Sequence, residues 1–316
     1  MNSTRNISLA ASLAGLVLIG SLRACRRQVS EFCKKLEQDN SQAVYVKDGV
    51  VLQYREEGPS DGPVAVVLHA AGGGHDQGLL LASRLLPRDY RIIAISRPGY
   101  LKSSPESDLS VQSADLHCLL KKKLAIDKIS ILLGMSMGSV LALEYATQHP
   151  VESLILLSPF VPYEGDNPPQ KPDLPSPPMW ILKAFFGTEF IKWLSIQLGV
   201  GNAMCGVTRD TPPGAKRFVS RFLETLFPVR ERFEGFCIDV QVLMQHRISR
   251  ARLTRIEAPI LYIAANDDAQ VKPSENRFPA TMETQITRVA RKKGGHMLIA
   301  DYQATAAAIR KFLGKS

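Results

Sequence analysis

The stretch ISILLGMSMG, residues 129–138, decides how this chain folds. Its first five residues are an apolar run, which is typical of a parallel strand buried on both faces. The pattern G-x-S-x-G follows at once, and residues 139–148 then have the spacing of a helix. A serine at such a strand–turn–helix junction lies on a sharp, strained turn, so its neighbours cannot be bulky and its hydroxyl points out of the sheet. Ser136 is therefore the candidate nucleophile.

A glycine-rich loop provides the second part of the candidate site. The segment HAAGGG, residues 69–74, ends another apolar run, and its glycines let the backbone approach a ligand closely. We expect the amide of Ala71 to form an oxyanion hole with the amide of Met137, which follows the serine. Gly72 is expected to belong to the same substrate-binding loop. His69 is expected to orient this loop by hydrogen bonding rather than to act as a base.

An acid and a base complete the set, in the chain order Ser, Asp, His. Asp267 and Asp268 follow an apolar run at residues 260–264, and a carboxylate at the end of a strand can orient a histidine. His296 follows two glycines and is the only one of the six histidines that comes after both the serine and these acids. It would take the serine proton and return it to the leaving group, while the acid holds the imidazole tautomer. Only one of the two carboxylates can point at the ring.

Strands that alternate with helices run through most of the chain. This alternation predicts an α/β fold, in which helices cover both sides of a mostly parallel sheet. A short hairpin closed by Asp48-Gly49 is expected to add an antiparallel edge. The predicted strands are residues 43–46, 50–54, 64–69, 91–95, 129–133, 154–157, 260–264 and 285–289, and the predicted helices include residues 111–124, 139–148 and 302–313.

Residues 160–257 interrupt this alternation. They begin with a proline-rich lead, which cannot form a regular helix, and continue with the strongly apolar residues 179–198. We interpret this insertion of nearly a hundred residues as a helical lid over the carboxyl ends of the strands, where open α/β sheets bind ligands. The α/β core would then comprise residues 43–159 and 258–316. Four aromatic side chains of the insertion either line a lipophilic pocket or form the lid's own core: Trp180, Phe185, Phe186 and Trp193.

The first 42 residues are expected to be an apolar anchor or signal followed by a basic linker. Residues 7–22 form an uncharged apolar run of sixteen residues between Arg5 and Arg23, slightly short of the about 20 residues that span a bilayer. An uncleaved anchor that keeps the catalytic domain cytoplasmic, a cleaved signal, a lipoprotein signal ending at Cys25, and a buried helix are the alternatives. We expect membrane association through this segment, on a side that the sequence does not decide.

Composition limits the class of partner. A net charge of +9 is typical of proteins that bind nucleic acid or an anionic membrane surface. For nucleic acid, the chain has no zinc-finger spacing, no RRM-type aromatic signature and no long basic helix. Its five cysteines form no C-x-x-C pair, so neither a disulfide framework nor a zinc site is expected. No P-loop or Rossmann glycine pattern is present, which argues against nucleotide chemistry. We therefore expect a small-molecule substrate and no nucleic acid, metal or cofactor.

Together these motifs resemble the α/β-hydrolase superfamily over residues 43–314. Within it the chain looks most like the group of lidded esterases, carbon–carbon hydrolases and non-heme haloperoxidases. The acid of that family typically stands in the pattern G-x-x-D-x-x-V. When the pattern is aligned on Val271, it selects Asp268 as the acid and puts Ala265 at the glycine position.

The chain departs from this group at three positions. The segment SRPGYLKS, residues 96–103, stands where the group usually has D-x-x-G-x-G-x-S. Ser96 therefore replaces the usual aspartate, and Leu101 replaces the second glycine. Ala70 replaces the glycine that usually follows the histidine of the oxyanion loop. These changes would reshape the pocket without removing a catalytic group.

The resemblance implies a serine hydrolase that cleaves a carboxylic ester or a related, lipophilic acyl compound. Ser136 would form an acyl-enzyme, which water then cleaves with His296 as base. A serine at the elbow argues against haloalkane dehalogenases and epoxide hydrolases, which carry an aspartate there. The same triad also serves carbon–carbon bond hydrolysis and cofactor-free perhydrolysis. A catalytically silent binding module is the alternative from another functional class.

Overall fold

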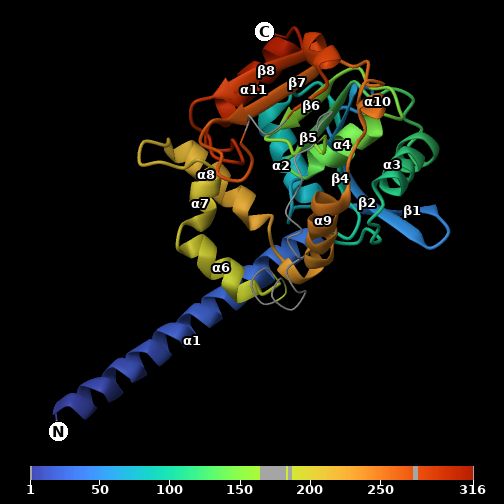
Figure 1. The fold of residues 1–316 in the computed structure, drawn as a ribbon. Coiled ribbons are helices and arrows are strands. Elements are labelled where there is room, and N and C mark those ends of the chain that lie inside the picture. Colours follow the sequence, from blue (N-terminus) through green and yellow to red (C-terminus); the bar gives the residue numbers. More distant parts are fainter. Residues whose placement is uncertain (1, 164–182, 184–186, 273–276, 316) are drawn as a thin grey trace.

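The computed structural model describes residues 2–163, 183, 187–272 and 277–315. An eight-stranded sheet in the order β1-β2-β4-β3-β5-β6-β7-β8 runs through the molecule (Figure 1). β1 and β2 form the predicted antiparallel hairpin, β2 pairs antiparallel with β4, and the remaining pairs are parallel. The α/β fold class is confirmed. The strands are β1 (Gln42–Lys47), β2 (Val50–Glu57), β3 (Val64–Leu68), β4 (Arg91–Ser96), β5 (Ile131–Met135), β6 (Leu154–Leu157), β7 (Ile260–Ala265) and β8 (Ile286–Arg291).

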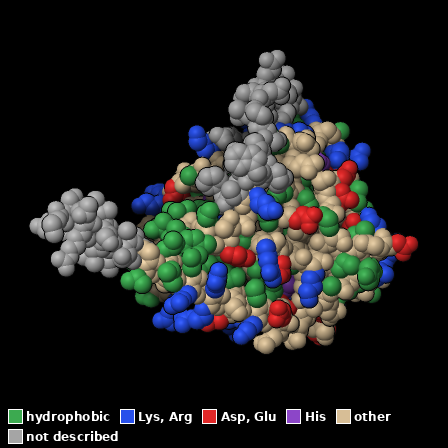
Figure 2. All heavy atoms as spheres, turned by 90° about the horizontal axis from the view of Figure 1, so that it is seen from below, with side chains coloured by type: hydrophobic (Ala, Val, Ile, Leu, Met, Phe, Trp, Pro, Cys, Tyr) green, Lys and Arg blue, Asp and Glu red, His purple; other side chains and the backbone are tan. Residues whose placement is uncertain are grey.

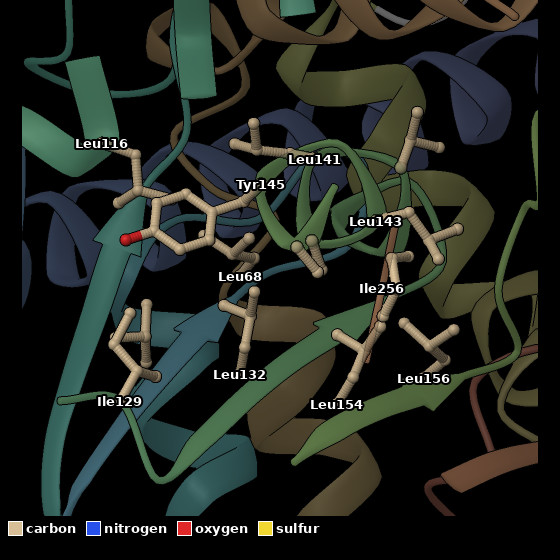
Figure 3. Packing of buried hydrophobic residues seen from close by; sticks show 14 of the residues in the cluster. Leu68, Leu116, Ile129, Leu132, Leu141, Leu143, Tyr145, Leu154, Leu156 and Ile256 are labelled. Atoms are coloured by element: carbon tan, nitrogen blue, oxygen red, sulfur yellow. The ribbon is translucent and has the colours of Figure 1, made fainter. Parts of the chain in front are cut away.

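Helices cover both faces of the sheet. Val67 of β3 packs in an apolar cluster with α2 and α11, whereas the next residue, Leu68, packs in another cluster with α3 and α4. The two residues lie in different clusters because successive side chains of a strand point to opposite faces of the sheet. Figure 3 shows Leu68, Leu132 and Leu154 of three neighbouring strands in the same apolar cluster as Tyr145 of α4, with Leu68 beside the Tyr145 ring. These helices are α2 (His75–Leu85), α3 (Leu109–Cys118) with its continuation η1 (Leu119–Lys123), α4 (Gly138–Ala146) and α11 (Tyr302–Phe312), and η4 (Ala280–Gln285) precedes β8.

The described part of the insertion between β6 and β7 is helical. Three of the four aromatic residues singled out in it, Trp180, Phe185 and Phe186, lie outside the described residues. The fourth, Trp193, donates a hydrogen bond from its indole Nε1 to Gln28 Oε1, 2.7 Å away. This side chain therefore packs against the N-terminal helix. The helices of the insertion are α6 (Glu189–Gln197), α7 (Val200–Met204), α8 (Pro213–Glu224), η2 (Val229–Glu231), α9 (Phe233–Gln245) and α10 (Arg250–Leu253).

The N-terminal helix α1 (Asn2–Glu37) corrects the expectation of a membrane anchor. It extends away from the body of the molecule (Figure 1). Of the helices in the described ranges, none combines the length and the apolar character needed to cross a membrane, so the predicted membrane association through this segment is wrong. The apolar run of sixteen residues is too short, since Arg23 ends it and the helix continues with basic residues. Its second half instead packs on the protein, where Phe32 stacks on Phe227 with ring centroids 5.7 Å apart.

Apolar side chains remain exposed where α1 meets α6. The two helices are in contact. Figure 2, which views the molecule from below, shows hydrophobic side chains gathered on this face. The large exposed apolar side chains of this region are Leu16, Val17, Leu18 and Ile19 of α1, Ile191 and Leu194 of α6, Leu198 directly after α6, and Val200 of α7.

Ser96, which replaces the family's aspartate, belongs to a buried hydrogen-bond series. Its Oγ lies 2.8 Å from His75 Nδ1, and His75 Nε2 lies 2.5 Å from Asp39 Oδ2. Ser96 and His75 are fully buried. Asp39 follows α1, so the carboxylate that position 96 lacks comes from the N-terminal segment.

Candidate active site

The turn after β5 holds Ser136 in a strained conformation. Its φ is +51°, in the left-handed region that side chains rarely adopt. The two glycines of the pattern are required by close packing: a Cβ at Gly134 would lie 2.6 Å from the Cα of Ser139, and one at Gly138 would lie 2.3 Å from the carbonyl oxygen of Leu68. The motif therefore has the geometry of a nucleophile elbow.

Ser136, His296 and Asp268 form a continuous hydrogen-bond series. Ser136 Oγ lies 2.7 Å from His296 Nε2, and His296 Nδ1 lies 2.8 Å from Asp268 Oδ2. A carboxylate only accepts, so Nδ1 carries the proton and Nε2 is left to accept from the serine hydroxyl. The three residues are 3%, 2% and 4% exposed, which removes competing water from the series.

Asp268 is held as a carboxylate. Its other oxygen accepts hydrogen bonds from the amides of Gln270 and Val271 at 2.8 and 2.9 Å. Burial by itself would raise the pKa of Asp268, but the hydrogen bonds from His296 and from these amides outweigh it and keep the pKa below its ordinary value.

The neighbouring Asp267 has a different contact. Its Oδ1 accepts hydrogen bonds of 3.0 Å from the amides of both Gly294 and Gly295, directly before the histidine. Asp267 thus shapes the histidine loop, and Asp268 contacts the ring. Their position in the sequence alone does not show which of the two carboxylates contacts His296.

The backbone amides of Ala71 and Met137 are the pair that the sequence predicts as oxyanion donors. Among the residues that the structure describes, the amides of Ala71 and Met137 donate to no protein acceptor. The amide of Gly72 is engaged, because it donates to the hydroxyl of Tyr100 at 3.1 Å. Ala71 and Gly72 both line the cavity that contains Ser136. The role of Ala71 and Met137 as oxyanion donors stays a prediction, and Gly72 is part of the cavity wall.

His69 lies under this loop and is fully buried. Its Nδ1 donates to the carbonyl oxygen of Ala70 at 2.7 Å, and its Nε2 accepts from the amide of Arg97 at 3.0 Å. Burial, together with the nearby charge of Arg97, keeps the pKa of His69 well below its usual value. The neutral ring therefore fixes the loop by two hydrogen bonds.

A cavity of about 460 Å³ opens beside Ser136. Its walls come largely from α6, α7 and α8, and most of them are apolar. Cys205 also contributes, but burial raises the pKa of its thiol to about 12, so it stays protonated and does not compete as a nucleophile. The apolar lining residues include Ile191, Ile196, Val200, Met204, Phe222, Leu223, Leu226, Phe233, Phe236 and Met297, and the polar ones include Lys192, Ser195, Arg232 and Gln270.

The sequence analysis did not single out most of these wall residues. One signal was available in α8, where the buried residues Ala215, Phe218, Val219, Phe222 and Leu223 follow the three- and four-residue spacing of an amphipathic helix. The contact of Tyr100 with the oxyanion loop was also missed, because it joins segments 28 residues apart. Within the described ranges, no cluster of three His, Cys, Asp or Glu side chains could hold a metal ion.

The sequence profile of a family described as the alpha/beta hydrolase fold matches residues 63–301. This chain belongs to the α/β-hydrolase fold family. The match includes the elbow serine, both adjacent carboxylates and His296. None of the curated proteins matches the chain in sequence.

Solved structures of other α/β hydrolases have the same fold. An alpha/beta hydrolase fold protein from Nakamurella multipartita is 20% identical, with a TM-score of 0.67 over 87% of this chain and 98% of that one. The esterase RhEst1 from Rhodococcus sp. ECU1013 is 21% identical, with a TM-score of 0.63 over 87% and 98%. A bromoperoxidase from Bacillus anthracis is 18% identical, with a TM-score of 0.63 over 87% and 99%. Membership of this family supports a hydrolase activity.

Proposed function

We propose that this α/β hydrolase is a serine esterase that cleaves a carboxylic ester or a related acyl compound. The observation that carries the proposal is the series Ser136–His296–Asp268, with bonds of 2.7 and 2.8 Å, at the wall of a largely apolar cavity. Further support comes from the amides of Ala71, which lines this cavity, and Met137, which follows the serine, because neither donates to an acceptor among the described residues. Nucleophile, base, orienting acid and oxyanion donors are the parts that acyl transfer needs.

The proposed reaction has two steps. Ser136 Oγ attacks the carbonyl carbon while its proton passes to His296 Nε2, and the amides of Ala71 and Met137 bind the oxyanion. His296 then protonates the leaving alcohol, and an acyl-enzyme remains. Water attacks this ester with His296 as base, and the acid leaves as Ser136 recovers its proton. Asp268 stabilises the imidazolium in both steps.

We also propose that the substrate is a lipophilic small molecule, and that residues 160–257 form the lid over it. Support comes from the cavity walls, where the apolar side chains of α6, α7 and α8 would cover a hydrocarbon chain without leaving polar groups unpaired.

Labelling with a fluorophosphonate probe tests the proposed nucleophile. The wild-type chain should label, Ser136→Ala should not, and His296→Ala should label far more slowly because the serine loses its base. Ser113→Ala is the matched control, since it removes a buried hydroxyl from α3. A well-folded wild type that fails to label with both large and small phosphonates would contradict the proposal.

A series of p-nitrophenyl esters tests the substrate class. With lengthening acyl chains, kcat/KM should rise from acetate to a medium-length chain and then fall when the cavity of about 460 Å³ is filled. A labelled enzyme that cleaves no ester would exclude this substrate class. It would favour carbon–carbon bond hydrolysis or perhydrolysis by the same triad.

A further inference from the structure

Arg97 and Asp239 form a buried ion pair between distant parts of the chain. Arg97 lies in the loop after β4, and Asp239 lies on α9 of the insertion. Nη1 and Nη2 of Arg97 donate to the two oxygens of Asp239 at 2.6 and 2.8 Å, and each residue is only 4% exposed. A bidentate ion pair of this kind fixes the relative orientation of the two side chains and also neutralises their charges. Neither residue was predicted to be functional from the sequence.

Tyr100 connects this ion pair to the oxyanion loop. Its hydroxyl donates to Asp239 Oδ2 and accepts the amide hydrogen of Gly72 at 3.1 Å. Burial, and then the charge of Asp239, raise the pKa of Tyr100 well above its usual value, so the phenol keeps the proton that it donates. Asp239 is therefore one hydrogen-bonded side chain away from the residue next to Ala71.

Arg97 reaches the same loop from the other side. Its Nε donates to the carbonyl oxygen of His69 at 3.0 Å, and its backbone amide donates to the ring of His69. The ion pair thus holds the loop at both ends, through His69 and through Gly72. Ala71 lies between these two fixed points.

The backbone of the insertion is also docked on this loop. The amide of Gly235, in the first turn of α9, donates to the carbonyl oxygen of Gly99 at 2.8 Å. A Cβ at Gly235 would lie 2.2 Å from the ring of Tyr100, so only glycine permits this approach. The amide of Leu101 donates to the carbonyl oxygen of Glu231 at 2.7 Å. α9 is therefore fixed in register against the loop.

We propose that Asp239 is a positioning residue of the active site, contributed by α9 of the insertion. Through Arg97 and Tyr100 it holds the oxyanion loop so that the amide of Ala71 faces the developing oxyanion. The proposal rests on the proposed esterase function. Asp239 itself does not line the cavity, so its effect on the reaction would pass through its two partners.

Asp239→Asn tests the proposal, because it keeps the shape of the side chain and removes its charge. We expect kcat for a medium-chain ester to fall about 10- to 100-fold, while KM changes less than about threefold, since the loop acts on the transition state. Binding of a trifluoromethyl ketone, which forms a tetrahedral oxyanion on Ser136, should weaken by a similar factor. Binding of the carboxylate product should stay the same. The pH profile of kcat/KM should keep its shape, because the triad is untouched.

Glu144→Gln is the matched control. Glu144 of α4 is a fully buried carboxylate that accepts a hydrogen bond from Arg252 of α10, outside the active site. This variant should lose stability and keep both kcat and the affinity for the ketone. Tyr100→Phe offers a second measurement if Asp239→Asn does not fold: it removes the hydroxyl that links Asp239 to the Gly72 amide, leaves the Arg97–Asp239 ion pair in place, and should lower kcat and ketone affinity in the same direction.

The outcomes separate the two proposals. If the wild type labels and cleaves esters but Asp239→Asn and Tyr100→Phe behave like Glu144→Gln, the positioning role is overturned and the esterase function stands. If the wild type neither labels nor cleaves esters, the function fails and the positioning role fails with it.

Discussion

Ser136 lines the cavity with its backbone at a φ of +51°, between two glycines whose positions tolerate no side chain. The strain of one residue is offset by the packing around it, as is common at active sites. The carbonyl oxygen of Leu68 blocks the Cβ position of Gly138, so β3, β5 and α4 meet at this point.

Gly138→Ala should therefore destabilise the whole domain. A Cβ 2.3 Å from a carbonyl oxygen forces the backbone of β3 or α4 to move, at a cost of about 3 kcal/mol in the free energy of unfolding. Urea denaturation measures the loss. Gly214→Ala in α8 is the control, because its Cβ would meet nothing within 4 Å, and it should stabilise by up to about 1 kcal/mol. Equal stability of the two variants would contradict the packing argument.

Asp268→Asn and Asp267→Asn separate the two adjacent carboxylates. An asparagine at position 268 cannot stabilise the imidazolium, so the labelling rate and kcat should fall by about 10³-fold or more. An asparagine at position 267 still accepts hydrogen bonds from the two glycine amides, so the rate should fall less than about tenfold. Stopped-flow labelling gives both rates, and a larger effect at position 267 would reverse the assignment.

These residues show how far sequence reasoning reaches at this scale. Ser136 and His296 could be singled out because a motif and the chain order limit where they stand. Asp268 needed the family pattern, since its distinction from Asp267 is one of side-chain direction. Asp239 could not be found, because its contact with Arg97 spans 142 residues and depends on how α9 docks.

At the scale of elements, the strands were predictable because a strand buried on both faces must be a continuous apolar run. The predicted strand at residues 50–54 extends to residue 57, where polar side chains continue the pairing with β4. The predicted helix at residues 111–124 is divided into α3 and η1. The helices of the insertion were harder to predict, because their apolar faces meet a cavity and each other rather than the sheet.

The ion pair between Glu144 of α4 and Arg252 of α10 should make the free energy of unfolding depend on pH at acidic pH. Glu144 accepts hydrogen bonds from Ser110 and Arg252, and His246 Nε2 lies 3.4 Å away. Burial would raise the pKa of Glu144, but these contacts outweigh it and lower the pKa from 4.5 to about 2. Because the pKa of Glu144 is lower in the folded chain, its ionised carboxylate stabilises the fold above about pH 4.5. This stabilisation is lost as the carboxylate becomes protonated towards pH 2.

Glu144→Gln should remove this part of the acid dependence. The free energy of unfolding at pH 7 should fall by about 3 kcal/mol, and its slope between about pH 4.5 and 2 should flatten. Thermal denaturation across that range measures both. An unchanged slope would mean that Glu144 ionises alike in the folded and unfolded chain.

At the scale of the whole molecule, the N-terminal helix was the main error of sequence reasoning. An apolar run of sixteen residues between arginines suggested a span, but hydropathy alone cannot show which contacts a helix makes. Phe32 and Gln28 of its second half contact the insertion instead, and Asp39 after it contacts His75 of α2.

Phe32→Ala should lower the stability of the folded chain. Phe32 is 8% exposed and packs with Phe227 and Val229, so its loss should cost about 3 kcal/mol. Leu18→Ala on the same helix removes a side chain that is 51% exposed and should change little. Guanidinium denaturation of both variants tests whether the second half of α1 belongs to the folded unit; equal midpoints would show that it does not.

The buried series Ser96–His75–Asp39 has a consequence for any search that recognises enzymes by a three-dimensional template. Such a template scores distances between a serine, a histidine and an aspartate, and two series of these residues occur within the described ranges. Of the two serines, Ser96 has no exposed surface, whereas Ser136 lines a cavity and is accessible to a reagent that enters it. The two histidines are also oriented differently. His75 contacts Ser96 through Nδ1, whereas His296 contacts Ser136 through Nε2. A template that includes ring orientation and solvent access would match only the series at Ser136. A template based on distances alone would match both series.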